Sequence, residues 1–148
     1  MKSILTFTLC LVLVGTAPAD SARMFDEYGD IQFADEKARL DNLAIHLKQK
    51  PDMDVWYYIF AGTKNCEGEA RRRAVRAKNY LVKTRGIQPD RVKWVDEGYR
   101  EHLLVEVWVW PRKLSKPYTK NSSLDKSELP MIRNCKSKEH QRQRRINL

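Results

Sequence analysis

Hydrophobic and polar positions follow a helical period in two blocks of the chain. From Asp35 to Lys50, apolar residues recur at three- and four-residue steps, which predicts an amphipathic helix that Asp35 caps and Pro51 ends. The apolar positions of this block are Ala38, Leu40, Leu43, Ala44 and Leu47. A second helix is predicted from Glu67 to about Arg85, with Gly86 as its stop. Its inward stripe consists of Ala70, Ala74, Ala77 and Leu81.

Other blocks have the composition of strands. "MDVWYYIFAG", residues 53–62, is a β-branched and aromatic run that ends in glycine, which predicts a strand buried on both faces. "RVKWVDEG", residues 91–98, and "HLLVEVWVW", residues 102–110, predict two more strands, and a short first strand is expected within residues 23–33. The order β-α-β-α-β-β predicts an α+β fold, a two-layer sandwich whose helices pack on one face of a mixed sheet.

The last predicted strand divides its side chains between two faces. The first face holds Leu103, Val105, Val107 and Val109, and the second holds Leu104, Glu106, Trp108 and Trp110. If the valine face meets the helices, Trp108 and Trp110 lie on the open face, where Trp56, Tyr58 and Phe60 can join them. We therefore expect an interaction surface around Trp56, Trp108 and Trp110, for another subunit, a glycan or the chain's own tail. The alternative is that the C-terminal segment simply covers it.

The N-terminal residues have the pattern of an export signal. One lysine precedes an apolar run from Ile4 to Val14, and Ala17-Pro18-Ala19 follows it, which predicts a signal peptide over residues 1–19. The run is too short to span a bilayer. The mature chain is therefore expected in the periplasm or secreted, with no transmembrane segment.

Charge separates the mature chain into two parts. Residues 20–111 carry 16 Lys and Arg against 16 Asp and Glu, whereas residues 112–148 carry 11 against three, a net charge of +8. The predicted organisation is one domain over 20–111 and a basic, largely disordered tail over 112–148. Anionic polymers or surfaces are the expected partners of such a tail, and no specific nucleic acid is expected. The alternative is that the tail only confers solubility.

Two cysteines remain after removal of the signal peptide. In an exported chain an isolated pair commonly forms a disulfide, so Cys66 is expected to pair with Cys135. Closing about 70 residues would contribute on the order of 4 kcal/mol of stability. The alternative is that the two thiols stay reduced because the compartment lacks an oxidant.

Several segments, in this order and spacing, resemble the C-terminal domain of bacterial outer membrane protein A, a family of periplasmic peptidoglycan-binding modules. "EKARLDNLAIHLKQKPD" is similar to the first helix of the family, and "YYIFAGTK" to its strand and Gly-x-Thr-Asp loop. "RAVRAKNYLVKTRGIQPDRV" is similar to its Arg-Ala helix, Gly-Ile turn and following Arg, and "EGYRE" and "LLVEVWV" to its glycine segment and last strand. The resemblance spans about residues 25–111.

This resemblance implies a ligand site at the loop and the second helix. In the family, an Asp of the Thr-Asp loop and an Arg of the Arg-Ala helix hold the charged end of a diaminopimelate side chain. Here Lys64 follows Thr63, so the acidic member is missing, and the Arg aligns with Arg73 or, one turn on, Arg76. We expect Arg73 and Arg76, completed by Thr63 and Lys64, to bind peptidoglycan or another anionic wall polymer. Arg71 is expected nearer the buried side of the helix.

One alternative to wall binding remains for this chain. The arginines can be a solvated helix face with local ion pairs, such as Glu69 with Arg73, and the domain can then act as a protein-interaction or dimerisation module. No nucleophile, metal-protease or phosphate-loop pattern is present. We therefore expect no enzyme, no catalytic residue, no metal site and no cofactor.

Overall fold

The computed structural model describes residues 21–63 and 66–115 of the 148-residue chain. Its elements are β1 (Arg23–Tyr28), α1 (Phe33–Gln49), β2 (Met53–Gly62), α2 (Glu69–Asn79), a π-helical turn (Tyr80–Thr84), a 3-10 turn (Pro89–Arg91), β3 (Val92–Arg100) and β4 (Leu104–Pro111). The predicted order β-α-β-α-β-β and the α+β class are confirmed.

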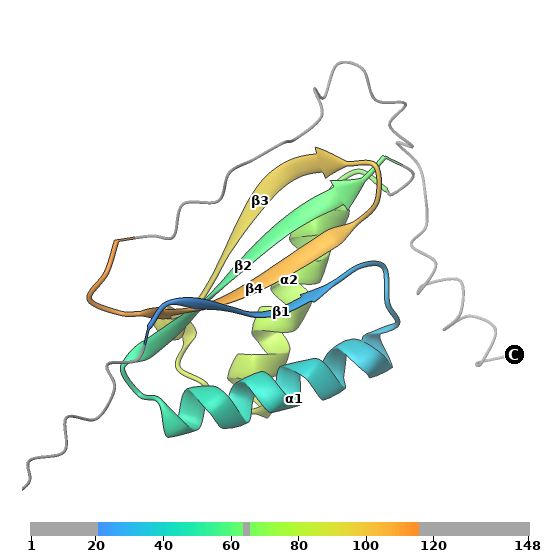
Figure 1. Cartoon of the computed structure of the whole chain (residues 1–148). Coiled ribbons are helices and arrows are strands. Elements are labelled where there is room, and N and C mark those ends of the chain that lie inside the picture. The colour runs from blue at the N-terminus through green and yellow to red at the C-terminus, as the bar shows by residue number, and fades with distance from the viewer. Residues whose placement is uncertain (1–20, 64–65, 116–148) are drawn as a thin grey trace, which may run out of the picture.

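The four strands form one mixed sheet in the order β1-β4-β2-β3. β4 pairs antiparallel with both β1 and β2, while β2 pairs parallel with β3. Figure 1 views the sheet with α2 behind it and α1 along its lower side. β4, the last of the described strands in the sequence, therefore lies inside the sheet, between β1 and β2.

The core lies between the sheet and the helices. On β2, Met53, Val55, Tyr57, Ile59 and Ala61 point into it, and on β4 Val105, Val107 and Val109 do so. The predicted alanine and leucine stripe of α2 is buried as expected, because small side chains let this helix approach the sheet closely. Ala38, predicted on the inward stripe of α1, is exposed, so that expectation was wrong.

Both predicted helices differ from the structure at their ends. α1 begins at Phe33, two residues before Asp35, so Asp35 lies in the first turn and is not the cap. Its carboxylate still favours the helix dipole from that position. The second helix begins at Glu69 instead of Glu67 and ends its α-helical part at Asn79. The π-helical turn then continues it to Thr84, and Gly86, two residues on with a φ of +71°, is the predicted stop.

Several expectations fall outside the described residues. The signal peptide over 1–19, most of the basic tail, Lys64 and Cys135 are among them, so these remain predictions. Cys66 is described, and its predicted disulfide with Cys135 also stays a prediction. None of the helices in the described part is long and apolar enough to cross a membrane.

Candidate functional site

Arg73 of α2 is a buried cation that faces other parts of the domain. Its Nε donates a hydrogen bond to Glu69 Oε1 at 2.9 Å, and its Nη2 forms an ion pair with Asp30 in the loop between β1 and α1. Only 7% of the residue is exposed. Burial opposes its charge, but the hydrogen bond to Glu69 and the charge of Asp30 outweigh burial and raise the pKa of Arg73. Arg73 therefore fastens α2 to the loop that starts α1.

Arg76, one turn further along α2, also meets a carboxylate of the domain. Its Nη2 donates to Glu36 Oε2 of α1 at 2.5 Å, and its guanidinium carbon lies 4.3 Å from the centre of the Phe33 ring. Glu36 is only 1% exposed, and its other oxygen accepts a hydrogen bond from Tyr28. The side chain of Arg76 is 23% exposed, so part of its guanidinium reaches the surface.

The structure places Thr63 in a different set of contacts. Its Oγ1 donates to the carbonyl of Glu101 at 3.2 Å, and its backbone N–H donates to the carbonyl of Arg100 at 3.1 Å. Thr63 therefore ties the end of β2 to the turn between β3 and β4. The described contacts of Arg73 and Arg76 join them to carboxylates on other elements and not to Thr63.

The structure corrects the expected orientation of Arg71. Arg71, expected toward the buried side, is exposed, and Arg73 is the buried one. At 100° per residue, Arg73 lies about 70° from the centre of the alanine stripe and Arg71 about 90°. This difference of about 20° in direction is small. Arg73 is buried because it forms ion pairs with Asp30 and Glu69 on its side of the helix.

A groove runs along the outer side of α2 and the π-helical turn. Its volume is about 740 Å³. Its lining consists of Phe33, Arg71, Arg72, Val75, Arg76, Asn79, Tyr80, Lys83 and Thr84. Four of these residues are cationic and none is acidic. We call this feature the α2 groove.

The cations of the α2 groove differ in how far the domain itself engages them. Arg72 donates to Glu69 Oε2 and to the carbonyl of Glu67, and its side chain is half exposed. Within the part of the chain that the structure describes, Arg71 and Lys83 have no ion-pair partner, and both are exposed. Arg71 and Lys83 are therefore the cations best placed to meet an external anion.

A hydrogen-bonded cluster holds one wall of the α2 groove. Tyr80 donates its hydroxyl hydrogen to Asp41 Oδ1 at 2.7 Å, and Arg85 donates to the same carboxylate from Nε at 2.6 Å. The hydrogen bonds from Arg85 and from Tyr80 lower the pKa of Asp41. Because Asp41 belongs to α1, this cluster fixes the π-helical turn, and hence the Tyr80 ring, against the first helix.

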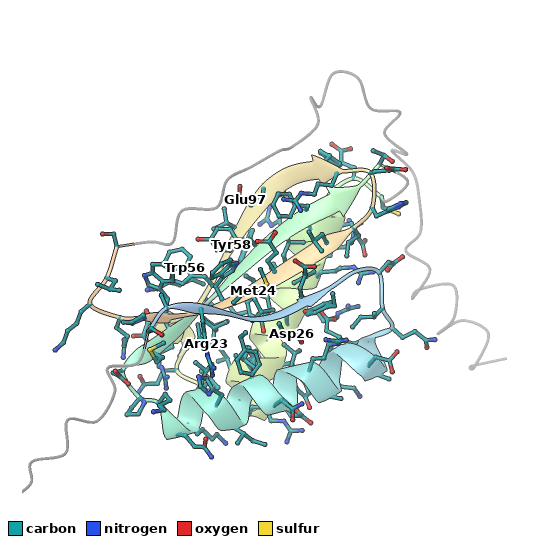
Figure 2. The ribbon with its side chains drawn as sticks, in the orientation of Figure 1. Arg23, Met24, Asp26, Trp56, Tyr58 and Glu97 are labelled. Carbon is teal, nitrogen blue, oxygen red and sulfur yellow. The ribbon has the colours of Figure 1, made fainter. Side chains whose placement is uncertain are left out.

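The opposite face of the sheet carries the predicted aromatic side chains, of which Tyr58 and Phe60 are fully buried while Trp56, Trp108 and Trp110 are half-buried. Trp56 lies directly across from Trp108 in the β2–β4 register, and Trp56 stacks on Tyr58 with ring centres 6.4 Å apart. Figure 2 shows Met24, Trp56 and Tyr58 on the side of the sheet that faces the reader. Leu104, Glu106, Trp108 and Trp110 are half-buried while the alternate valines are buried, so the predicted division of β4 into two faces is confirmed.

Charged side chains lie in contact with the aromatic rings of this face. The Lys93 ammonium lies 5.1 Å from the centre of the Trp56 ring, and the Arg100 guanidinium lies 3.7 Å from that of Phe60. The Glu106 carboxylate accepts a hydrogen bond from Trp108 Nε1 at 3.3 Å. We call Met24, Trp56, Tyr58, Trp108 and Trp110 the tryptophan face.

The described residues contain no group of three or more His, Cys, Asp or Glu side chains arranged to hold a metal ion. His46 packs against Phe25 with ring centres 5.3 Å apart, and His102 is exposed beside Glu101.

The sequence analysis did not predict the carboxylates on other elements that form ion pairs with Arg73 and Arg76. The Glu69–Arg73 pair follows from its four-residue spacing, but Asp30 and Glu36 are about 40 residues away and give no local signal. Lys83 was missed because it is a single lysine near the end of the predicted helix, with no local pattern that marks a ligand site. Searches of protein-family models and of curated proteins found no match to the chain.

Proposed function

We propose that this chain is an exported, non-enzymatic module of the cell envelope that binds peptidoglycan or another anionic wall polymer through the α2 groove. The observation that carries the proposal is the lining of the groove, which has four cations and no carboxylate. The charges of Arg71 and Lys83 can pair with a ligand, and the partly exposed side chains of Arg72 and Arg76 add two more cations. The export signal and the resemblance to a peptidoglycan-binding family support the envelope setting.

The shape of the α2 groove suits an extended ligand better than a small ion. Arg71 and Thr84 are 13 positions apart, which corresponds to about 20 Å along a helix axis. Phe33, Val75 and Tyr80 supply apolar surface between the charges, and 41% of Val75 is exposed. A polymer with regularly spaced carboxylates and apolar carbon between them matches this pattern, because each Arg can donate two parallel hydrogen bonds to a carboxylate.

The proposal moves the binding residues along the helix from those that the family resemblance implies. Arg76 is common to both sets, while Arg73 acts mainly as a link between α2 and Asp30. Thr63 and Lys64 stay candidates for the same ligand only if it extends past the start of α2. Binding at the α2 groove does not need the missing Asp of the Thr-Asp loop.

The test is co-sedimentation of the mature chain, residues 20–148, with purified peptidoglycan at low and high salt. Arg71→Gln with Lys83→Gln removes two charges from the groove without breaking a described ion pair. We expect this variant to bind about two- to thirtyfold more weakly at low salt, since each lost contact with a carboxylate is worth roughly 0.2–1 kcal/mol at a solvated site.

Two further variants remove the same charge elsewhere. Arg23→Gln with Lys48→Gln acts on exposed positions of β1 and α1, and Arg144→Gln with Arg145→Gln acts on the tail. Selective weakening by the groove variant supports the proposal. Equal weakening by all three would mean that net charge alone drives binding, and loss only in the tail variant would assign binding to the tail; either result contradicts the α2 groove as the site.

A second candidate is a protein-interaction or dimerisation module that uses the tryptophan face. The observation that favours it is the cross-strand pair of Trp56 and Trp108 beside Met24, which is 44% exposed. Such a module would form a salt-resistant dimer or complex that Trp108→Ala weakens. Sedimentation equilibrium at several protein concentrations separates this candidate from wall binding, because the α2 groove lies on the other side of the domain.

A further inference from the structure

We propose that the chain's own C-terminal segment, residues 116–135, lies across the tryptophan face. This inference goes beyond the proposed function, because it concerns the opposite side of the domain and does not depend on the ligand of the α2 groove. Three features of the described residues and the sequence support it: the point where the described chain ends, the position of Cys66, and the chemistry of the two surfaces.

The described chain ends on this face. After β4, the backbone N–H of Arg112 donates to the carbonyl of Asp52 at 2.9 Å, and that of Leu114 donates to the carbonyl of Pro111 at 3.0 Å. These bonds turn the chain back, and Trp110 Nε1 then donates to the carbonyl of Ser115 at 2.7 Å. Trp110 belongs to the tryptophan face, so residue 116 begins beside it.

The position of Cys66 indicates along which path the C-terminal segment crosses the sheet. Trp110 pairs with Asp54 near the start of β2, whereas Cys66 follows the far end of the same strand. β2 has ten residues and so spans about 33 Å. If Cys135 pairs with Cys66 as predicted, residues 116–135 must cover this distance, and 20 residues reach at most about 70 Å. The helices occupy one face of the sheet, which leaves the tryptophan face as the direct path.

The two surfaces are complementary in chemistry. The segment contains Tyr118, Leu124, Leu129, Met131 and Ile132, which can pack on the rings. It also carries four Lys and Arg against two Asp and Glu. On the sheet, Glu27 and Glu106 are cross-strand neighbours, and the charges of Glu97 and Glu106 add to the effect of burial in raising the pKa of Tyr58. A basic, partly apolar strip of chain therefore fits a surface where rings lie beside carboxylates.

A tethered segment has an advantage over a separate partner. A short flexible connection gives the segment an effective concentration in the millimolar range at the face. A second copy of the chain at micromolar concentration would need a correspondingly stronger contact to displace it. The attached segment is therefore the favoured occupant.

The test is hydrogen–deuterium exchange, followed by mass spectrometry, of the oxidised mature chain. We expect amides within residues 116–135 to exchange at least about tenfold more slowly than unstructured peptide, and this protection to disappear in a Trp56→Thr, Trp108→Thr variant. Unchanged protection of α2 shows that the variant is folded. Ile45→Thr with Val75→Thr, which changes two exposed apolar residues on the helices, is the matched control and should leave the segment protected.

A second measurement does not depend on any variant. Zero-length carbodiimide cross-linking of a mixture of ¹⁴N and ¹⁵N chains should join Glu27 or Glu97 to Lys116, Lys120 or Lys126 within one chain. Free exchange of residues 116–135 in the wild type, or protection that the tryptophan substitutions do not change, would overturn the proposal. Cross-links only between differently labelled chains would overturn it in favour of a second copy.

Discussion

The carboxylate of Glu36 on α1 accepts a hydrogen bond from the guanidinium of Arg76 on α2, and Glu36 is almost completely buried. The second carboxylate oxygen accepts a hydrogen bond from Tyr28 of β1 at 3.1 Å. One buried side chain thus connects the first strand to both helices. An arginine that looks in the sequence like part of a ligand site is also part of the framework of the domain.

Arg76→Ala should lower the free energy of unfolding by about 3 kcal/mol, because it leaves the Glu36 carboxylate buried without its cation. Arg71→Ala, in the same helix but exposed, should change it by less than about 0.5 kcal/mol. Urea unfolding followed by circular dichroism measures both. Adding Glu36→Gln to Arg76→Ala removes the uncompensated charge and should recover part of the loss; equal midpoints for Arg76→Ala and Arg71→Ala would contradict the structural role of Arg76.

Arg91 is predicted to resist conservative replacement. Its guanidinium donates to the carbonyls of Leu47 at 2.9 Å, Lys50 at 2.7 Å and Met53 at 2.6 Å, so it closes the connection between α1 and β2. A lysine cannot present the same planar fork to three carbonyls. Arg91→Lys should therefore cost about 2 kcal/mol of stability in the same unfolding experiment, since buried carbonyls lose their donors.

The matched control for Arg91 is Arg85→Lys. Arg85 is partly exposed, and its ion pair with Asp41 lies at the surface, so this substitution should cost less than about 1 kcal/mol. A smaller loss for Arg91→Lys than for Arg85→Lys would show that the carbonyl contacts of Arg91 contribute little.

Two buried tyrosines should respond in opposite ways to loss of their hydroxyl groups. Among the described residues, the Tyr57 hydroxyl is buried without a hydrogen-bond partner, whereas the Tyr28 hydroxyl donates to Glu36. Tyr57→Phe should be neutral or stabilising by up to about 1 kcal/mol, and Tyr28→Phe should destabilise by about 1–2 kcal/mol. Thermal unfolding of the two variants side by side checks the pair, and a clear loss for Tyr57→Phe would point to a water or other partner at its hydroxyl.

Stability should fall steeply in alkali. Burial raises the pKa of Tyr58 to about 12, aided by the charges of Glu97 and Glu106, and burial also raises the pKa values of Tyr28 and Tyr57. Unfolded tyrosine ionises near pH 10, so the folded state holds these protons more tightly. Their contribution to stability is complete below about pH 10 and is lost as the pH rises toward and beyond 12.

Absorbance at 295 nm and circular dichroism, recorded together from pH 9 to 12.5, test this expectation. Ionisation of the buried tyrosines should coincide with unfolding. Tyr58→Phe should make the loss of stability between pH 10 and 12 less steep. Ionisation of all tyrosines near pH 10 in a folded protein would contradict the raised pKa values.

The elements were largely predictable because each has a local signature. The valines and tryptophans of β4 alternate strictly, and the alanine stripe of α2 fits one helical face, so strand, helix and burial follow from spacing alone. The π-helical turn was not predictable, since the apolar stripe simply continues through Leu81. The start of each helix differed from the prediction by two residues, because no side-chain cap marks the start of either helix.

The candidate site was less predictable than the fold. Sequence spacing shows that Arg73 and Arg76 lie on one helix, but it does not show that Asp30 and Glu36 come from distant elements to meet them. Those pairings depend on how α1 and the β1–α1 loop pack against α2. Arg71 and Lys83 can be identified as the exposed cations without an ion-pair partner among the described residues only once these internal contacts are known.

The place of β4 in the sheet determines when the domain can assemble. Among the described strands, β1 pairs only with β4, which is the last of the four in the sequence and so the last to be synthesised. Before β4 is synthesised, β2 and β3 can pair only with each other, and the backbone N–H and C=O groups of β1 stay hydrogen-bonded to water. Loop closure over the whole domain must therefore precede completion of the sheet, so folding should be concentrated in one late step. A domain whose sheet cannot be completed before β4 is present suits the transport in an unfolded state that the proposed export requires.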